Sequence, residues 1–102
     1  MSLDFRELTI NFDNTAGKKQ NERATAVFGS NVKKAQAVLK GFHVAYANGD
    51  HPIWKLEVDL DVERVVTNTV TVAADYLLRD SSGNIDDPFG GWIQVIVIAD
   101  VA

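Results

Sequence analysis

The chain has 102 residues, 46% of them hydrophobic and 24% charged, so it can form one compact domain and has little room for two. Its net charge of −4 argues against nucleic acid as a partner, because neutralising phosphates requires a dense surface of Lys and Arg. The absence of cysteine excludes disulfides and thiolate metal sites; it is compatible with the cytoplasm but does not determine the compartment. We expect no membrane partner, because no apolar run is long enough to span a bilayer and no secretory signal is visible.

Alternation with a period of two dominates the first half of the chain and predicts β-strands, because successive side chains of a strand point to opposite faces. Residues 7–12 (ELTINF) and 22–28 (ERATAVF) are short stretches of this kind. In the stretch 33–50 the apolar positions change phase at Lys40-Gly41. This slip predicts one long strand with a β-bulge, or two strands that turn a corner.

The second half of the chain continues the pattern. Residues 56–63 place apolar side chains on one face and a row of acidic side chains on the other, namely Glu57, Asp59, Asp61 and Glu63. Residues 68–80 repeat the alternation, and residues 92–99 (WIQVIVIA) are apolar at nearly every position, which is typical of a central strand covered on both faces. We therefore predict an all-β fold, a single-domain antiparallel β-sandwich of about six strands over residues 1–102.

The acidic row has two interpretations. Carboxylates two residues apart on a strand lie at a distance that glycosidase chemistry can use, but that chemistry also needs a cleft. We favour a solvated outer face, paired across a strand with Lys34 and Lys40.

The segment 80–91 places oxygen-bearing side chains at alternate positions, a spacing that calcium loops and polar hairpins share: Asp80, Ser82, Asn84 and Asp86. As a calcium loop it lacks a glycine at the sixth position, and Gly91 stands where a closing glutamate is expected. The sequence favours a hairpin tip, in which these side chains bond to the backbone and to water, and leaves a calcium site as the alternative.

Ligand-binding candidates gather near two polar segments, because loops on a rigid sandwich commonly carry function. The first segment contributes Asp50, His51 and Trp54, and the second contributes Arg79 and the metal candidates. No nucleophile–base pair is visible, since cysteine is absent and no serine lies in a Gly-x-Ser-x-Gly motif. We therefore predict a binding protein without enzymatic activity.

Five segments over about residues 26 to 98 carry a family resemblance: VFGSNV, AVLKGFHV, KLEVDLDV, NTVTVAADY and GWIQVIVI. In this order they resemble the H-type lectin domain, a six-stranded antiparallel sandwich. The resemblance implies a carbohydrate-binding protein that forms trimers or hexamers and holds N-acetylgalactosamine-type sugars near subunit boundaries. Lys55 stands nearest to the position where the family places an arginine, and Leu78-Arg79-Asp80 replaces an aromatic–polar pair.

Two functions follow as expectations. The first is a glycan-binding module that uses its end loops and Lys55, and the alternative is a structural subunit without a small-molecule ligand. Both interpretations predict a homo-oligomer. In the second, the acidic row would meet Lys33, Lys34 and Lys40 across subunits.

Overall fold

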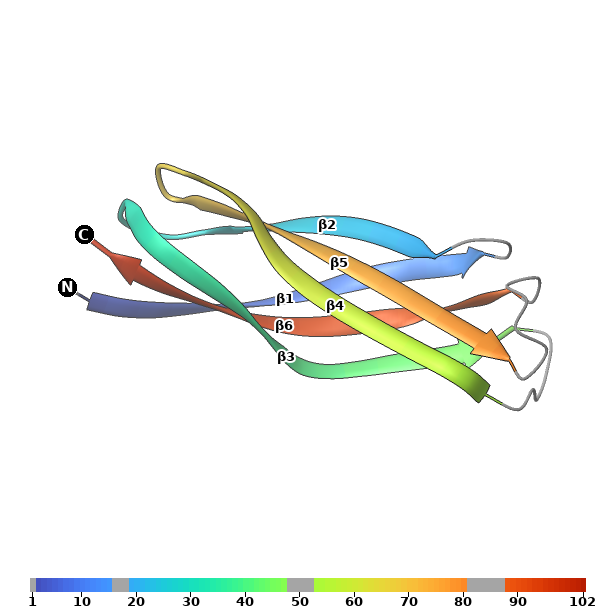
Figure 1. Ribbon diagram of the computed structural model, residues 1–102. Coiled ribbons are helices and arrows are strands. Elements are labelled where there is room, and N and C mark those ends of the chain that lie inside the picture. The colour runs from blue at the N-terminus through green and yellow to red at the C-terminus, as the bar shows by residue number, and fades with distance from the viewer. Residues whose placement is uncertain (1, 16–18, 48–52, 81–87) are drawn as a thin grey trace.

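The structure, a computed structural model, describes residues 2–15, 19–47, 53–80 and 88–102. Within these ranges the regular structure is entirely β and contains no helix. The six strands are β1 (Ser2–Thr15), β2 (Gln20–Val27), β3 (Val32–Tyr46), β4 (Ile53–Val66), β5 (Thr69–Asp80) and β6 (Phe89–Val101), as labelled in Figure 1.

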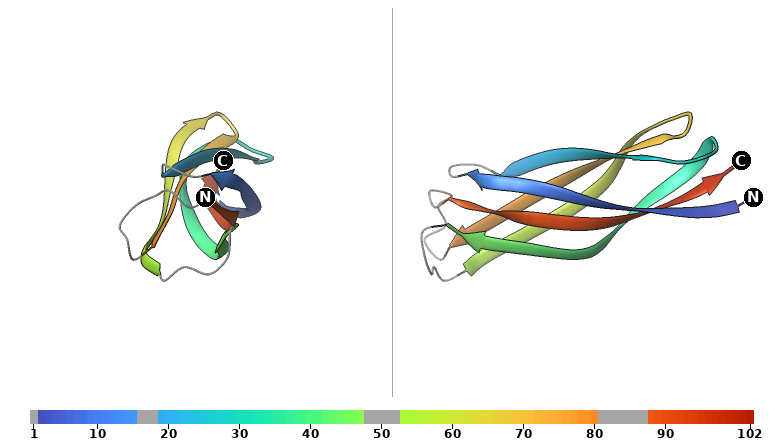
Figure 2. Two further views of the ribbon diagram at one scale, coloured as in Figure 1. Left: turned by 90° about the vertical axis from the view of Figure 1, so that its right-hand side faces the viewer. Right: turned by 180° about the vertical axis from the view of Figure 1, so that it is seen from behind.

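The strands form two three-stranded sheets packed face to face, and every strand pair is antiparallel. Sheet A has the order β1-β6-β3 and sheet B the order β2-β5-β4. The molecule is elongated, at 49 × 19 × 17 Å, and Figure 2 shows the two layers along the long axis and from behind. The prediction of an all-β sandwich of six antiparallel strands is confirmed.

The predicted phase slip in the third strand is also confirmed. β3 is one long strand whose register against β6 shifts between Leu39 and Gly41. The bulge lets apolar residues on both sides of Lys40 keep their contact with the sandwich, although their parity in the sequence differs.

Alternation along the two central strands builds the core. Even-numbered residues of β5 and odd-numbered residues of β6 point inward, so Val72 and Val95 are fully buried. Burying one such side chain contributes about 1.5–3 kcal/mol to folding. A register slip of one residue would turn each inward row toward water, and this fixes the pairing.

The prediction that the last strand is central is confirmed, but the prediction that both of its faces are covered is wrong. β6 lies between β1 and β3, and its even-numbered side chains remain partly exposed: Trp92, Gln94, Ile96, Ile98 and Asp100. Among the described elements, sheet B packs on one face of sheet A only (Figure 1). The apolar run therefore includes a face that none of the described elements covers.

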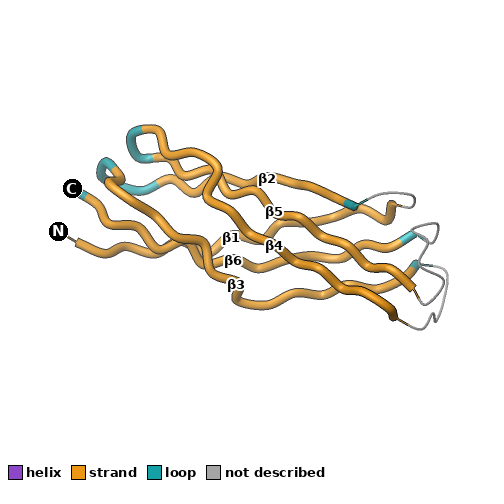
Figure 3. Tube along the Cα trace, viewed as in Figure 1, coloured by secondary structure: helices purple, strands orange, loops and turns teal. Residues whose placement is uncertain are grey.

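The strands run along the long axis of the sandwich, so their ends and connections gather at its two opposite ends (Figure 3). The chain termini and the turn at Thr67 and Asn68, where Thr67 has a φ of 52°, lie at the terminal end. At the other end, which we call the loop end, Tyr46 pairs with Phe89 and Ile53 pairs with Asp80. The strands that flank the two polar segments of the sequence therefore all reach the same end.

A buried tyrosine joins the two sheets near the loop end. The Tyr76 hydroxyl, from β5, donates to the carbonyl oxygen of His43 at 2.7 Å and lies 3.0 Å from that of Gly90. The Tyr76 ring stacks on Phe12 with a centroid distance of 4.4 Å and meets Phe89 at 5.8 Å. Burial raises the pKa of the hydroxyl, so the group stays protonated and remains a donor.

Gly91 makes room for this link. Its φ of 150° lies in a region that disfavours side chains, and an added Cβ would lie 1.9 Å from the His43 oxygen and 2.7 Å from the Tyr76 hydroxyl oxygen. We infer that only glycine fits here, because any Cβ would overlap with the His43 backbone and with the Tyr76 hydroxyl.

We predict that Gly91→Ala lowers the free energy of unfolding by about 3 kcal/mol or more, because it combines backbone strain with a clash. The measurement is urea unfolding followed by tryptophan fluorescence. Gly29→Ala is the control: nothing lies within 4 Å of its added Cβ, and its effect should stay within about 0.5 kcal/mol. Equal stabilities for the two variants would contradict this account of Gly91.

Candidate functional site

Most of the candidate residues from the sequence fall outside what the structure describes. This holds for Asp50, His51, Ser82, Asn84 and Asp86, and for the side chains of Trp54 and Asp80. The calcium interpretation and most of the predicted ligand site therefore remain predictions.

The two described candidates lie side by side. Lys55 of β4 pairs in register with Arg79 of β5, close to the loop end. Lys55 is exposed and Arg79 is half-buried. The structure thus brings two cationic side chains together on neighbouring strands, where an anionic or strongly polar group could meet both.

The acidic row lies on the outer face of sheet B and is exposed or half-buried, as its alternation predicts. Its cross-strand partners differ from those expected. Arg23 of β2 binds both carboxylate oxygens of Glu63, at 2.7 and 3.0 Å, and Lys19 forms an ion pair with Glu57. Lys40 instead bonds to Glu7 at 2.8 Å, because β3 belongs to sheet A.

These pairs shift the pKa values of the two glutamates. The hydrogen bond from Arg23 is the main cause of the lowered pKa of Glu63, and the bond from Lys19 does the same for Glu57. The Arg23–Glu63 pair is exposed and Glu57 is half-buried, and a cation of the same chain balances the charge of each glutamate. A glycosidase-like role needs one carboxyl with a raised pKa in a cleft, and neither glutamate fits that requirement.

Three carboxylates of the same face lie close together. Asp59, Asp61 and Asp75 each place an oxygen within 4.8 Å of the others, and Asp75 accepts a hydrogen bond from Asn21 at 2.7 Å. Exposed carboxylates commonly gather without a bound ion, so this cluster by itself does not indicate a calcium site.

The outer face of sheet A differs in chemistry from that of sheet B, and it has two halves. An ion pair between Lys40 and Glu7 joins β3 to β1 and separates the halves. The terminal half is rich in apolar side chains: Leu3, Phe5, Val38, Ile96 and Ile98. The loop half holds aromatic and uncharged polar side chains: Thr9, Asn11, Asn14, His43, Trp92 and Gln94.

A pair of aromatic rings forms the centre of the loop half. Trp92 of β6 lies between Asn11 of β1 and His43 of β3 in the sheet register. The Trp92 and His43 rings stack with centroids 6.0 Å apart and an interplanar angle of 24°. Trp92 is half-buried and His43 is exposed, so the pair is supported by the sheet and is open to solvent.

Carboxamides and two glycines surround these rings. Gln94 lies on the same face as Trp92, two residues further along β6. Its neighbour in β3 is Gly41, which has no side chain to cover it. Gly90 leaves room for the Asn14 side chain, because a Cβ added at Gly90 would lie only 2.7 Å from the Asn14 Oδ1 atom. The side chains of Asn11, Asn14 and Gln94 have no hydrogen-bond partner among the described residues, so their donors and acceptors face solvent.

The sequence contained part of this arrangement. His43 alternates with Phe42 and Val44, so the period of two places its side chain on the opposite face, and it lies there. Trp92 begins an apolar strand, which taken alone favours packing. Its parity could have indicated otherwise, because it alternates with the core residue Ile93.

No protein-family model matches the chain, and no curated protein or solved structure matches it either. The resemblance to H-type lectins therefore stays a prediction. Within the part of the chain that the structure describes, no helix is long and apolar enough to cross a membrane.

We predict that Glu63 titrates below the ordinary range for a glutamate, because Arg23 stabilises its charged form. The contribution of the pair to stability is present above the pKa of an unfolded glutamate and is lost as the pH falls through the lowered folded pKa. NMR titration of the side-chain carboxyl measures this midpoint. Arg23→Gln should return it toward the ordinary value, whereas the control Lys40→Gln, on the other sheet, should leave it unchanged.

Proposed function

We propose that this chain is a non-enzymatic carbohydrate-binding module whose described contact surface is the loop half of the outer face of sheet A. The observation that carries the proposal is the open Trp92–His43 ring pair with unpartnered carboxamides around it.

The chemistry of a sugar suits this surface. A pyranose ring presents C–H groups that pack against an aromatic ring, and hydroxyls that both donate and accept hydrogen bonds. Asn11, Asn14 and Gln94 each offer a donor and an acceptor, so they can bind hydroxyls in either sense. The half-buried indole holds its position without ligand, which lowers the ordering cost of binding.

Binding without catalysis is favoured by the surroundings of His43. Among the described residues this is the histidine that could act as a base, and its ring stacks on Trp92. Within the described ranges no hydroxyl is hydrogen-bonded to the imidazole ring of His43, since the Tyr76 hydroxyl bonds to the backbone carbonyl of that residue. A hydroxyl hydrogen-bonded to an imidazole ring is what acyl-transfer chemistry requires.

The loop end supports the same proposal. The flanking strands of the two polar segments end beside the loop half, and Lys55 and Arg79 lie at that end of sheet B. The sequence candidates Asp50, His51 and Trp54 belong to the first of these segments. The resemblance to H-type lectins makes N-acetylgalactosamine a natural first probe, with calcium added or withheld to test the segment that begins at Asp80.

A second candidate function, a homo-oligomeric structural subunit, is favoured by a different observation. The terminal half of the outer face of sheet A is apolar and is not covered by a described element of this chain.

We predict that Trp92 is the indole that responds to sugar. In a Trp54→Phe background Trp92 is the remaining tryptophan. A glycan array would identify a ligand, and fluorescence titration with that ligand and with N-acetylgalactosamine would show whether Trp92 responds. Isothermal titration calorimetry would give the affinity of each variant, including those without Trp92. Trp92→Ala should weaken binding by about tenfold or more, because it removes the apolar contact surface.

The controls separate this site from the loop candidates. Asn11→Ala with Gln94→Ala should weaken binding, and Trp54→Phe alone should not. Loss of binding in His51→Ala or Trp54→Ala, with full binding in Trp92→Ala, would move the site to the loop segments. An array without any bound glycan would contradict the proposed function itself.

A further inference from the structure

The terminal half of the outer face of sheet A combines an exposed ring with an apolar pocket. Leu3 and Phe5 of β1 are 61% and 56% exposed, among the most exposed large apolar side chains of the described residues. Exposed apolar groups gathered on one face are unfavourable in water and indicate an interaction surface.

The pocket has a volume of about 150 Å³. Leu3, Ala35 and Ile98 line it with apolar atoms, and its remaining lining residues are Lys34, Gln36 and Asp100. A cavity of about 150 Å³ can hold a benzene ring. The pocket therefore has the size and the apolar lining that a phenylalanine side chain needs.

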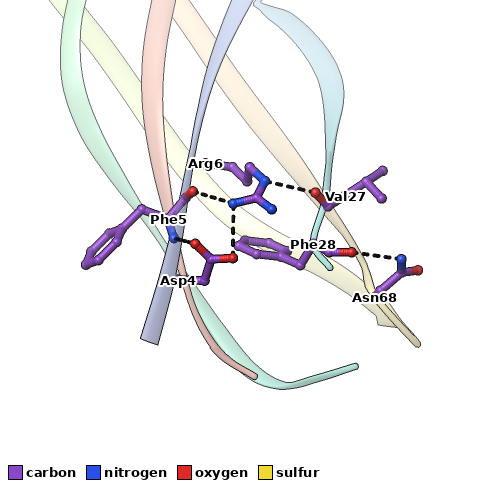
Figure 4. Close-up of polar contacts among 6 residues, drawn as sticks. All are labelled: Asp4, Phe5, Arg6, Val27, Phe28 and Asn68. Carbon is purple, nitrogen blue, oxygen red and sulfur yellow. Dashed lines mark hydrogen bonds and ion pairs between the residues drawn. The ribbon is translucent and has the colours of Figure 1, made fainter. Parts of the chain in front are cut away.

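Phe5 lies directly beside this pocket, in the same row of the sheet as two of the lining residues. In the sheet register, Phe5 is level with Ile98 and Gln36, and Leu3 is level with Asp100 and Lys34. Figure 4 shows the Phe5 ring pointing away from the neighbouring Arg6 side chain. The same face thus carries a projecting ring and a recess of matching size.

Arg6 holds β1 in place behind this ring. Its guanidinium donates to the carbonyl oxygens of Val27, at 3.0 Å, and Phe5, at 2.8 Å, and lies over the Phe28 ring with Cζ 4.8 Å from the centroid (Figure 4). Its ion pair with Asp4 has a length of 3.1 Å. These contacts fix the backbone that presents Phe5.

We propose that the occupant of this surface is a second copy of the chain, packed face to face about a two-fold axis so that Phe5 of each copy enters the pocket of the other. A surface that carries both a projection and its recess is self-complementary, which is the requirement for a two-fold interface. This proposal does not depend on the proposed carbohydrate function.

The charges of the pocket support the same occupant. The Oδ1 atom of Asp100 is buried and has no hydrogen-bond partner among the described residues, which is unfavourable for a carboxylate. Lys34 lies level with it on β3 and forms no ion pair within the described part of the chain. In a two-fold dimer, Lys34 of one copy can approach Asp100 of the other, twice.

The size of the surface sets the expected affinity. Three strands spaced about 4.8 Å apart and about six residues long cover roughly 300 Å². This matches the apolar patches that mark interaction sites, and two such faces together are smaller than the interface of a stable dimer. We therefore expect a weak, reversible dimer, with a dissociation constant on the order of 100 µM.

Sedimentation equilibrium from about 5 to about 500 µM tests the dimer over the range expected for a small interface. The wild-type protein should shift from monomer to dimer, and Phe5→Ser should raise the dissociation constant by about tenfold or more. Val66→Ser is the matched control, because Val66 is 49% exposed on sheet B, and it should leave the dimer unchanged.

A charge exchange tests the two-fold arrangement itself. Lys34→Asp and Asp100→Lys should each dimerise less well than wild type, because like charges then meet at both contacts. An equimolar mixture of the two variants should dimerise again, because each contact in the mixed dimer regains opposite charges. A misfolded variant could not produce this recovery.

Three outcomes would overturn the proposal: a wild-type protein that stays monomeric over the whole range, an assembly that Phe5→Ser leaves unchanged, and a mixture that fails to recover. Sugar binding measured on the same variants would remain intact in each case if the loop half is an independent site. Failure of the dimer and failure of the carbohydrate proposal can therefore be told apart.

Discussion

The hydrogen bond from the Tyr76 hydroxyl to the His43 carbonyl is the contact on which the loop end of the sandwich depends. It crosses the core from sheet B to sheet A, and it exists because Gly91 leaves space for both groups. On the opposite side of the same backbone stand the side chains of His43 and Trp92. The link that joins the sheets therefore also supports the open ring pair, so stability and the candidate site share one arrangement.

The two outer faces of the sandwich have different chemistry. On sheet B, ion pairs such as Arg23–Glu63 join opposite charges of the same chain, and the resulting polar surface is well solvated by water. On sheet A, the central strand β6 carries Ile96 and Ile98 on the face that sheet B does not cover. An apolar central strand is typical of a covered sheet, and none of the described elements of this chain covers that face. The Lys40–Glu7 pair divides that face into the region we assign to a second copy and the region we assign to sugar.

Part of the candidate site was within reach of the sequence. The alternation around His43 indicates its outward direction, and the same rule applied to β6 places Trp92 on the outer face as well. Gln94, two residues after Trp92, follows from the same rule. The involvement of Asn11 and Asn14 could not be predicted in this way, because they are more than 75 residues from Trp92 in the chain and become its neighbours only through the pairing of β1 with β6. The partners of the acidic row were mistaken for the same reason. Lys40 and Glu63 lie on strands that alternate alike, but the chain assigns them to different sheets.

The sequence by itself determined the strands, the phase slip near Gly41 and the all-β class, because side-chain alternation and glycine act locally along the chain. Only the tertiary structure decided which strands share a sheet and which face of β6 stays open. Those features depend on contacts between residues distant in sequence, such as Tyr76 with His43 and Phe5 with Ile98. Periodicity tells which residues of a strand point the same way, but it does not tell what lies opposite them.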